Sequence, residues 1–480
     1  MRQHIRFLLN GLVMVIAAGM TFPVMAQPAT TSAVQPSSTS TYRVKKNLRE
    51  DAAGSTLGFS LSAIGYSSES SVDNSFQQKA EMNMRFKMDG SFFGDSRITL
   101  GTFSEPQSMY YDLPEAYLGY GDKYNAITAG RKHETLSFAD SFFDLGLIQS
   151  HQTTDNINFS EGGLTGLMVH FYTGDFGFKA AYNPVFIPNQ GPAVKAEDGK
   201  IVSSNRWAQK PPDQFKFGDQ NKEIIYAIRE YDISDIVLNS GVMGTVFFGG
   251  TQARPLLQLT YANQPVNELA LSRDTFSDIS TFKGYVYLTP VVLMHEVAAG
   301  DINLDSGKFK STFSVITDNP TNKKAVELEA MQTLSPLTMV SVYAAYDMGS
   351  PGRELSVYAA AAKVQGGEIK DLQADGKESN ISFATGRTQF KNPLRAGIKS
   401  DMFYIYNEAV NADVNVTYDQ ELKGSLLSML VKYKLFKGGM INVGADLIGM
   451  QNDTTSESES NFLAQNKAND RVFGGLTYVF

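Results

Sequence analysis

The chain has 480 residues, with 42 Lys and Arg against 50 Asp and Glu, so its formal net charge is −8. A chain this acidic is not expected to bind nucleic acid, whose phosphates attract basic surfaces. It contains no Cys, which excludes disulfides, thiolate metal sites and covalent haem attachment.

The first 26 residues have the pattern of a secretory signal peptide. Arg2 and Arg6 precede an apolar stretch from Leu8 to Phe22, and Ala26 is a small residue at the expected cleavage point. A single membrane anchor is the alternative, but the apolar stretch is short for a span. We therefore expect export, with cleavage after Ala26.

Residues 27–54 are rich in Pro, Ser, Thr and Gln and then become charged. This composition predicts a flexible periplasmic segment. Strand periodicity begins after it, with a first strand expected at 55–66, and residues 55–480 are expected to form a single barrel domain.

The second strand has the clearest alternation in the chain. Lys79, Glu81, Arg85 and Lys87 alternate with Ala and Met or Phe residues, and Asp89-Gly90 follows as a hairpin turn. A half-buried strand of a soluble sandwich alternates in the same way. What favours a membrane barrel is the repetition of this pattern along the chain.

Similar segments of roughly ten residues, the length that a tilted strand needs to cross a bilayer, recur to the end of the chain. They include 279–288, 290–299 and 324–333. About 21 segments fit, whereas a bacterial single-chain barrel has an even number. Counted from either end of the chain, long connections alternate with short ones, but the two counts disagree between 184 and 263. At least one segment is therefore assigned wrongly, and we expect this error within Glu223–Gly250. We expect an all-β, antiparallel, up-and-down transmembrane barrel of about 18 strands, within a range of roughly 16 to 20.

Long connections are expected on the extracellular side and short turns on the periplasmic side. The longest irregular stretch, 184–222, contains five Pro together with Arg206 and the only Trp, Trp207. Its apolar residues favour a loop folded partly into the lumen as a constriction or plug, with a surface loop as the alternative. The extracellular loops are expected at 133–162, 184–222, 365–392 and 451–470.

The chain ends in a strand pattern, with apolar residues at alternate positions leading to Tyr478 and Phe480. A last strand that pairs with the first would close a barrel and remove both edges. This ending resembles the C-terminal assembly signal of Gram-negative outer-membrane proteins. The stretch 113–118, with Ala129-Gly130-Arg131, is similar to the early strands of large porins and polysaccharide-export barrels.

The resemblance as a whole is to Gram-negative outer-membrane barrels of the porin type. It implies the outer membrane as the location and its lipids, the barrel assembly machinery and small hydrophilic solutes as partners. Porins of this size are often trimers, so a homotrimer is one expected assembly. No functional residue is carried over from the resemblance.

The residues opposite the apolar face should line the pore. Those we select are Lys79, Glu81, Arg85, Lys87, Arg131, Lys179, Glu327, Glu329, Lys432 and Lys434. They lean basic, and rings of Lys and Arg favour anions in a pore. The alternative is that these charges pair across strands and only fill a polar interior.

Enzyme motifs are weak. The chain has no Gly-x-Ser-x-Gly elbow, Walker loop or His-Glu-x-x-His, and no metal-type spacing of His, so we expect no enzyme activity, cofactor or metal. His133, His151 and Asp155 could imitate the site of a barrel hydrolase. The favoured function is a channel for the diffusion of small hydrophilic solutes, which would lean toward anions if the basic residues of the wall are not paired. The alternatives are an export conduit for an acidic polysaccharide and a structural or adhesive barrel that acts through its loops.

Overall fold

The structure is a computed structural model. It describes residues 54–68, 75–104, 108–122, 124–192, 194–203, 205–208, 211, 213–217, 219–251, 254–278, 283–323, 329–349, 353–373, 387–406, 408–451 and 461–480. The predicted signal peptide and nearly all of the predicted periplasmic segment lie outside these ranges.

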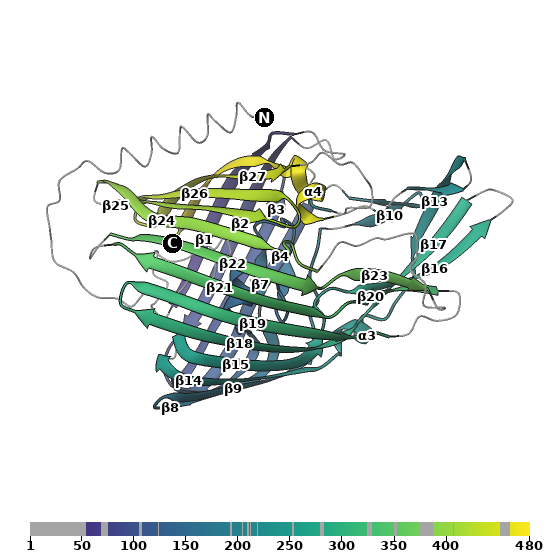
Figure 1. The fold of residues 1–480 in the computed structure, drawn as a ribbon. Coiled ribbons are helices and arrows are strands. Elements are labelled where there is room, and N and C mark those ends of the chain that lie inside the picture. The colour runs from purple at the N-terminus through teal and green to yellow at the C-terminus, as the bar shows by residue number, and fades with distance from the viewer. Residues whose placement is uncertain are drawn as a thin grey trace.

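Eighteen of the described strands form one closed antiparallel sheet (Figure 1). They are β1 (Gly54–Tyr66), β2 (Phe76–Met88), β3 (Phe92–Phe103), β4 (Ser108–Gly121), β5 (Asn125–Lys132), β8 (Leu164–Thr173), β9 (Phe176–Val185), β14 (Gly241–Thr251), β15 (Arg254–Pro265), β18 (Met294–Ser306), β19 (Phe309–Thr321), β21 (Leu337–Asp347), β22 (Leu355–Gly366), β24 (Pro393–Ile405), β25 (Glu408–Asp419), β26 (Gly424–Phe436), β27 (Gly439–Met450) and β28 (Arg471–Val479). Each strand pairs with the next in this order, and β28 pairs with β1, which closes the barrel. The predicted all-β antiparallel barrel of about 18 strands is confirmed.

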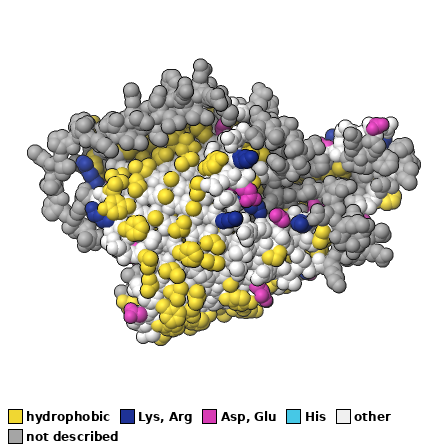
Figure 2. Space-filling model, in the orientation of Figure 1, with side chains coloured by type: hydrophobic (Ala, Val, Ile, Leu, Met, Phe, Trp, Pro, Cys, Tyr) yellow, Lys and Arg dark blue, Asp and Glu magenta, His cyan; other side chains and the backbone are white. Residues whose placement is uncertain are grey.

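Alternation along the strands separates an apolar outer face from a mixed inner face, because successive side chains of a strand point to opposite sides. Phe59, Leu118 and Val472 are among the exposed outward residues. Figure 2 shows hydrophobic side chains gathered over the outside of the barrel strands. A closed barrel with this outer face satisfies its backbone internally and presents apolar groups to lipid. Among the described residues, no helix is both long and apolar enough to cross a bilayer.

The two ends of the barrel differ. At one end, here called the turn end, short hairpins join neighbouring strands, such as Gly174-Asp175 between β8 and β9, and the C-terminus lies there as well. Gly307, in the turn after β18, has φ +59°, a conformation that suits Gly. The opposite end, the loop end, carries the long connections.

A second sheet projects from the loop end, at the right of Figure 1. It contains six described strands in the order β12 (Gln214–Phe217), β13 (Gln220–Ile228), β17 (Lys283–Val291), β16 (Ala270–Asp278), β20 (Glu329–Leu334) and β23 (Ile369–Gln373). Four connections between barrel strands contribute to it. The prediction that 279–288 and 324–333 cross the membrane was therefore wrong, since their strands β17 and β20 belong to this sheet.

The remaining described elements are short. They are α2 (Phe138–Phe142), α3 (Ile233–Val237), α4 (Phe462–Asn466), the 3-10 helix η1 (Lys467–Asn469), and the small hairpins formed by β6 (Ser150–Gln152) with β7 (Ser160–Gly162) and by β10 (Lys195–Glu197) with β11 (Lys200–Val202). All of them belong to connections at the loop end.

Phe480 lies at the seam where β28 meets β1. Its backbone N–H donates to the Leu57 carbonyl at 2.9 Å, and its ring makes edge contacts with Phe59 and Tyr478, at centroid distances of 6.0 and 4.5 Å. We expect Phe480→Ala to destabilise the closed barrel by about 1–3 kcal/mol, because it removes two aromatic contacts of about 0.5–1.5 kcal/mol each. The measurement is the folded fraction after refolding into detergent micelles.

The matched control is Phe92→Ala, which removes another exposed aromatic at the turn end, paired with Tyr120 away from the seam. Phe480→Ala should lower the folded yield more than this control does. Equal yields for wild type and Phe480→Ala would contradict a role for this side chain in closure and assembly.

Candidate functional site in the barrel lumen

The connection between β5 and β8, residues 133–163 and here called the crossing segment, folds into the barrel. Its helix α2 begins after Ser137, whose Oγ accepts from the Ala139 N–H at 3.0 Å as an N-cap. Apolar residues of the segment are buried against inward side chains of the wall from β8 to β22. The segment's members of this core are Leu136, Ala139, Phe142, Phe143, Leu147 and Ile148, and the wall's members include Met168, Met243, Ile316, Met339 and Tyr358.

The carboxyl group of Asp140 is buried within this packing. Its Oδ1 accepts from the Leu147 N–H at 3.1 Å, which fixes the turn after α2. Burial is the main cause that raises the pKa of Asp140, the Leu147 hydrogen bond lowers it, and the nearby carboxylates of Glu161, Asp301 and Asp318 raise it again, so that the net pKa is about 7. The crossing segment therefore carries an acid that titrates near neutral pH.

The far part of the crossing segment is bound to the opposite wall. Asp155 forms an ion pair with Arg471 of β28 at 2.5 Å, and Arg471 also pairs with Asp446 of β27 at 2.8 Å. The Asn158 side chain donates to Asp446 at 3.3 Å. Because the segment is rooted between β5 and β8 and held at β27 and β28, it spans the lumen from wall to wall.

Arg206 and Trp207, the predicted constriction residues, lie over this attachment at the loop end. The Arg206 guanidinium donates to the Asn469 Oδ1 at 3.1 Å and to the Ser68 carbonyl at 2.8 Å, and it stacks on the Tyr66 ring at 4.2 Å. Trp207 is buried in a cluster with Ile157, Leu426, Ile448, Phe462 and Leu463. These contacts bind the β9–β14 connection to the crossing segment and the wall.

The prediction that 184–222 is the part of the chain that enters the lumen was incomplete. The crossing segment spans the lumen, and 184–222 contributes Arg206 and Trp207 above it, while its strand β10, which pairs with β11, lies beyond the barrel end (Figure 1). The physical reason is that the apolar residues of 133–149 find a large apolar wall inside the barrel.

The wall formed by β2, β3 and β4 carries alternating charges that pair with one another. Lys79 lies 2.8 Å from Glu81, and Arg85 lies 2.5 Å from Asp95. Arg97 bridges Asp95 and Glu115, at 3.3 and 3.2 Å. These side chains keep access to solvent, 24% for Lys79 and 40% for Arg97, so this wall faces a part of the lumen that the crossing segment does not cover completely.

A second stretch of partly exposed charges lies on β24, β25 and β26. Lys434 pairs with Glu408 at 2.7 Å and Lys399 with Asp413 at 3.6 Å. Lys432 lies two residues from Lys434 on the same face of β26, between Asn411 and Asn442 of the neighbouring strands. Of the two basic residues predicted for this part of the pore wall, Lys434 thus lies beside an acid, and Lys432 lies between two amides.

The other predicted wall residues have different surroundings. Lys179 of β9 and Lys132 both pair with Glu134, at 3.1 and 2.6 Å. Burial alone would raise the pKa of Glu134, but the two ammonium groups outweigh it and lower the pKa to about 2. Arg131 donates to the Ser150 hydroxyl and to the Gly163 carbonyl, so it supports the crossing segment. Lys87 lies near the turn end, 3.8 Å from Asp89.

The placement of Glu329 in the pore wall was wrong. Glu329 lies in β20 of the six-stranded sheet, where it accepts from the Ser272 hydroxyl at 2.7 Å and approaches Arg229 at 3.7 Å. Glu327 lies outside the described residues. The alternation in the predicted segment 324–333 indicates a half-buried strand, but it does not show to which sheet the strand belongs.

Sequence reasoning missed Arg471 and the role of the crossing segment. A signal was available, because a solvated loop would not need Leu136, Phe142 and Leu147. The apolar residues of 184–222 carry the same signal. The pairing of Arg471 with Asp155 joins residues 316 positions apart, and no local pattern reports such a contact.

The histidines of the crossing segment do not assemble with Asp155. His133 Nε2 lies 2.7 Å from Glu161, whereas Asp155 bonds to Arg471. His151 stacks on Phe159, and burial lowers its pKa to about 4, so it is neutral at physiological pH. Within the described ranges, no three His, Asp or Glu side chains are grouped as a metal site.

No protein-family model matches the chain, and no curated protein matches it. Solved structures similar to it include crystal structures of three bacterial proteins. OccAB4 of Acinetobacter baumannii has 9% identity and a TM-score of 0.41, over 90% of this chain and 99% of that one. OccK2 (OpdF) of Pseudomonas aeruginosa has 9% identity and a TM-score of 0.44, over 91% and 98%. OpdQ of Pseudomonas aeruginosa has 9% identity and a TM-score of 0.44, over 89% and 97%. At these identities the similarity concerns the fold alone.

Proposed function

We propose that this protein, an outer-membrane β-barrel of the porin type, is a channel through which small hydrophilic solutes diffuse. The observation that carries the proposal is the inner face of the closed barrel. Beside β2–β4 and β24–β26 this face holds partly exposed ionic pairs, which favour water and polar solutes over lipid. Diffusion needs no further chemistry, only a polar passage of limited width.

The crossing segment would set that width. It is held by apolar packing on one side of the barrel and by the Asp155–Arg471 pair on the other. A segment attached at both ends acts as a fixed constriction. The same arrangement speaks against the export of a polysaccharide, which would need a wide lumen or a segment free to swing aside.

Selectivity is proposed to be weak. The predicted preference for anions depended on the basic residues of the wall, and Lys79, Arg85 and Lys434 each have a carboxylate within 3 Å. Paired charges produce a smaller net field in the passage than isolated ones. A preference for anions therefore requires that the positive charge of the basic residues along the passage exceed the negative charge of the carboxylates beside them.

The sheet at the loop end supports a second candidate function, contact with another molecule at the cell surface. Six described strands from four connections form this sheet beyond the barrel, which exceeds what a diffusion pore requires. Long loops placed on a rigid scaffold commonly carry binding functions. Sidedness follows the usual topology, with the loop end outward. Cells that lack the protein should attach to host surfaces less than cells that have it. Equal attachment would contradict this candidate function.

The channel is tested by the single-channel current of the purified, refolded protein in a planar bilayer under a gradient of KCl. We expect stable open steps with a reversal potential close to zero or slightly favouring chloride. A correctly folded barrel that carries no current would contradict the channel and leave the surface function.

Charge reversal tests whether the lysines of β2 border the conducting path. Lys79→Glu with Lys87→Glu should raise the permeability of K⁺ relative to Cl⁻ roughly threefold to tenfold, because a unit charge about 4 Å away is worth about 1 kcal/mol in water. The control is Lys363→Glu, since Lys363 lies on the outward face of β22, between the inward Ala362 and Val364. An unchanged permeability ratio in the double variant would place the current elsewhere.

A further inference from the structure

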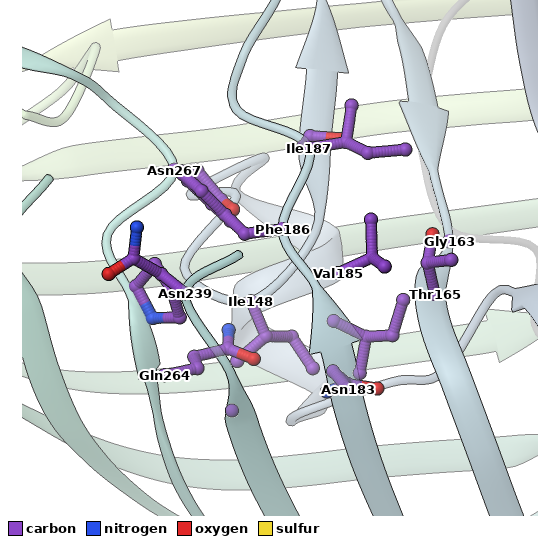
Figure 3. A pocket seen from close by; sticks show the side chains of 14 residues that line it. Ile148, Gly163, Thr165, Asn183, Val185, Phe186, Ile187, Asn239, Gln264 and Asn267 are labelled. Atoms are coloured by element: carbon purple, nitrogen blue, oxygen red, sulfur yellow. The ribbon is translucent and has the colours of Figure 1, made fainter. Parts of the chain in front are cut away.

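A small pocket lies at the loop-end rim of the barrel, between the crossing segment and the wall (Figure 3). It is here called the rim pocket. Its wall comes from the loop-end residues of β8, β9, β14 and β15, and the chain after β9 covers it. The residues that carry the argument are Ile148, Thr165, Asn183, Phe186, Gly241 and Gln264.

Gly241 makes room for this pocket. It is opposite Asn183 of β9 in the strand register, and a Cβ at this position would lie 2.6 Å from the Gln264 Cβ of β15. Any larger residue would push against Gln264. Because β14 has no side chain here, the two amides on the strands to either side border one open space.

Both amides are buried and have polar atoms without a partner. Asn183 is 5% exposed, and neither its Nδ2 nor its Oδ1 is hydrogen-bonded. Gln264 is 3% exposed with an unpaired Nε2, and the Thr165 hydroxyl is unpaired as well. Neighbouring Asn267, in contrast, donates to the Gly146 carbonyl at 2.7 Å. An unpaired buried polar group costs about 1–3 kcal/mol, so a ligand that satisfied these groups would be stabilised.

The chemistry of the pocket selects an uncharged ligand. None of its 14 lining residues is Asp, Glu, Lys or Arg, although the rest of the lumen is rich in them. A charged ligand would lose its hydration without gaining a counter-ion. The unpaired atoms include amide donors, an amide acceptor and a hydroxyl, which together match a group that both donates and accepts.

The size of the pocket limits how much of a ligand enters. Its free volume of about 30 Å³ holds roughly two water molecules or one hydroxymethyl group. Ile148, Val185 and Phe186 supply the apolar contacts that a CH₂ group needs. The body of the ligand would have to stay outside.

We propose that the rim pocket binds the hydroxymethyl end of a neutral polyol. Asn183 and Gln264 hold its hydroxyl, and Ile148 and Phe186 contact its methylene group. This assignment rests on the proposed channel function and deepens it, because it names neutral, polyhydroxylated solutes as a class that the protein retains at its loop end.

The test is saturation-transfer NMR of sorbitol on the full-length folded protein in micelles. The charged probe is glucarate, which has the same carbon skeleton but a carboxylate at both ends and therefore no hydroxymethyl group. We expect transfer to sorbitol and little to glucarate. Asn183→Leu and Gln264→Met, which keep the volume and remove the amides, should each weaken sorbitol binding about tenfold, as expected for the loss of one hydrogen bond to a buried ligand.

The matched control is Asn415→Leu, a buried inward amide on β25 that does not line the pocket. It should bind sorbitol like wild type. If Asn183→Leu fails to fold, Thr165→Val tests the same pocket with a milder change. Wild type without transfer, pocket variants that bind normally, or equal binding of glucarate would each overturn the proposal. The bilayer current is measured separately, so loss of the channel and loss of polyol binding are distinguishable.

Discussion

Replacing Arg471 by Met is expected to destabilise the barrel by about 3–5 kcal/mol and to increase both the size and the noise of the single-channel current. The Arg471 side chain is 1% exposed and neutralises two acids, Asp155 of the crossing segment and Asp446 of β27. Removing one partner of a buried ion pair leaves uncompensated charge in a poorly solvated place. The segment would then lose its ionic attachment to the far wall, keeping there the Asn158 hydrogen bond and the packing of Ile157, and the passage would widen.

Urea unfolding in micelles and recordings in planar bilayers measure the two effects. Arg254→Met is the matched control, because Arg254 is also largely buried and pairs with Asp305 at 3.1 Å near the turn end of β15, away from the crossing segment. It should lose stability but keep the current of wild type. Adding Asp155→Asn and Asp446→Asn to Arg471→Met should recover stability without recovering the constriction. A current unchanged by Arg471→Met would show that the attachment does not limit the passage.

Asp140→Asn is expected to remove a contribution that lowers the stability of wild type as pH rises from about 4 to about 7. Because the folded pKa of about 7 lies above the ordinary value of 3.8, the native protein keeps a proton that the unfolded chain releases. The contribution of Asp140 to the free energy of unfolding therefore falls as pH rises through this window, by roughly 4 kcal/mol in total, whereas His151, whose pKa of about 4 lies below its ordinary value of 6.5, contributes in the opposite direction. The stabilisation that the bound proton provides is fully present below the ordinary pKa of 3.8, and it decreases no further above about pH 7.

Asn cannot ionise, and its Oδ1 can still accept from the Leu147 N–H. The variant should resemble wild type at low pH and be more stable than wild type at pH 8. Chemical unfolding at pH 5 and pH 8 gives the free energy of unfolding of both proteins. We expect the stability advantage of the variant over wild type to be roughly 3 kcal/mol larger at pH 8 than at pH 5. Asp175→Asn, in the exposed β8–β9 turn, is the control and should leave the wild-type dependence intact. Parallel pH profiles for wild type and Asp140→Asn would refute burial as the origin of the effect.

Strands whose alternation of apolar and polar residues is visible within their own sequence were predictable. The alternation of Lys79, Glu81, Arg85 and Lys87 with apolar residues identified β2 and both of its faces, and the final residues identified β28. The period of two is a property of each strand by itself, so it needs no knowledge of the partner. It failed for β17 and β20, which alternate equally well outside the barrel. Those two strands account for part of the difference between the roughly 21 predicted segments and the 18 strands of the barrel.

The lumen was less predictable. Lys79 and Arg85 were correctly expected on β2, but the carboxylates beside them depend on register and rotamer. Asp95, for example, lies on β3 opposite Lys87 and reaches Arg85. Which connection enters the barrel was equally open, since both 133–162 and 184–222 contain apolar residues. The choice depends on a complementary wall assembled from β8 to β22.

By itself, therefore, the sequence determined that this chain forms an antiparallel barrel of about 18 strands with an apolar outside, because alternation and turn chemistry act over a few residues. Only the tertiary structure decided that the crossing segment spans the lumen, that Arg471 holds it, that a second sheet stands at the loop end and that the wall charges are paired. Each of these depends on contacts between residues far apart in the chain, which form only when the closed sheet has brought their strands together.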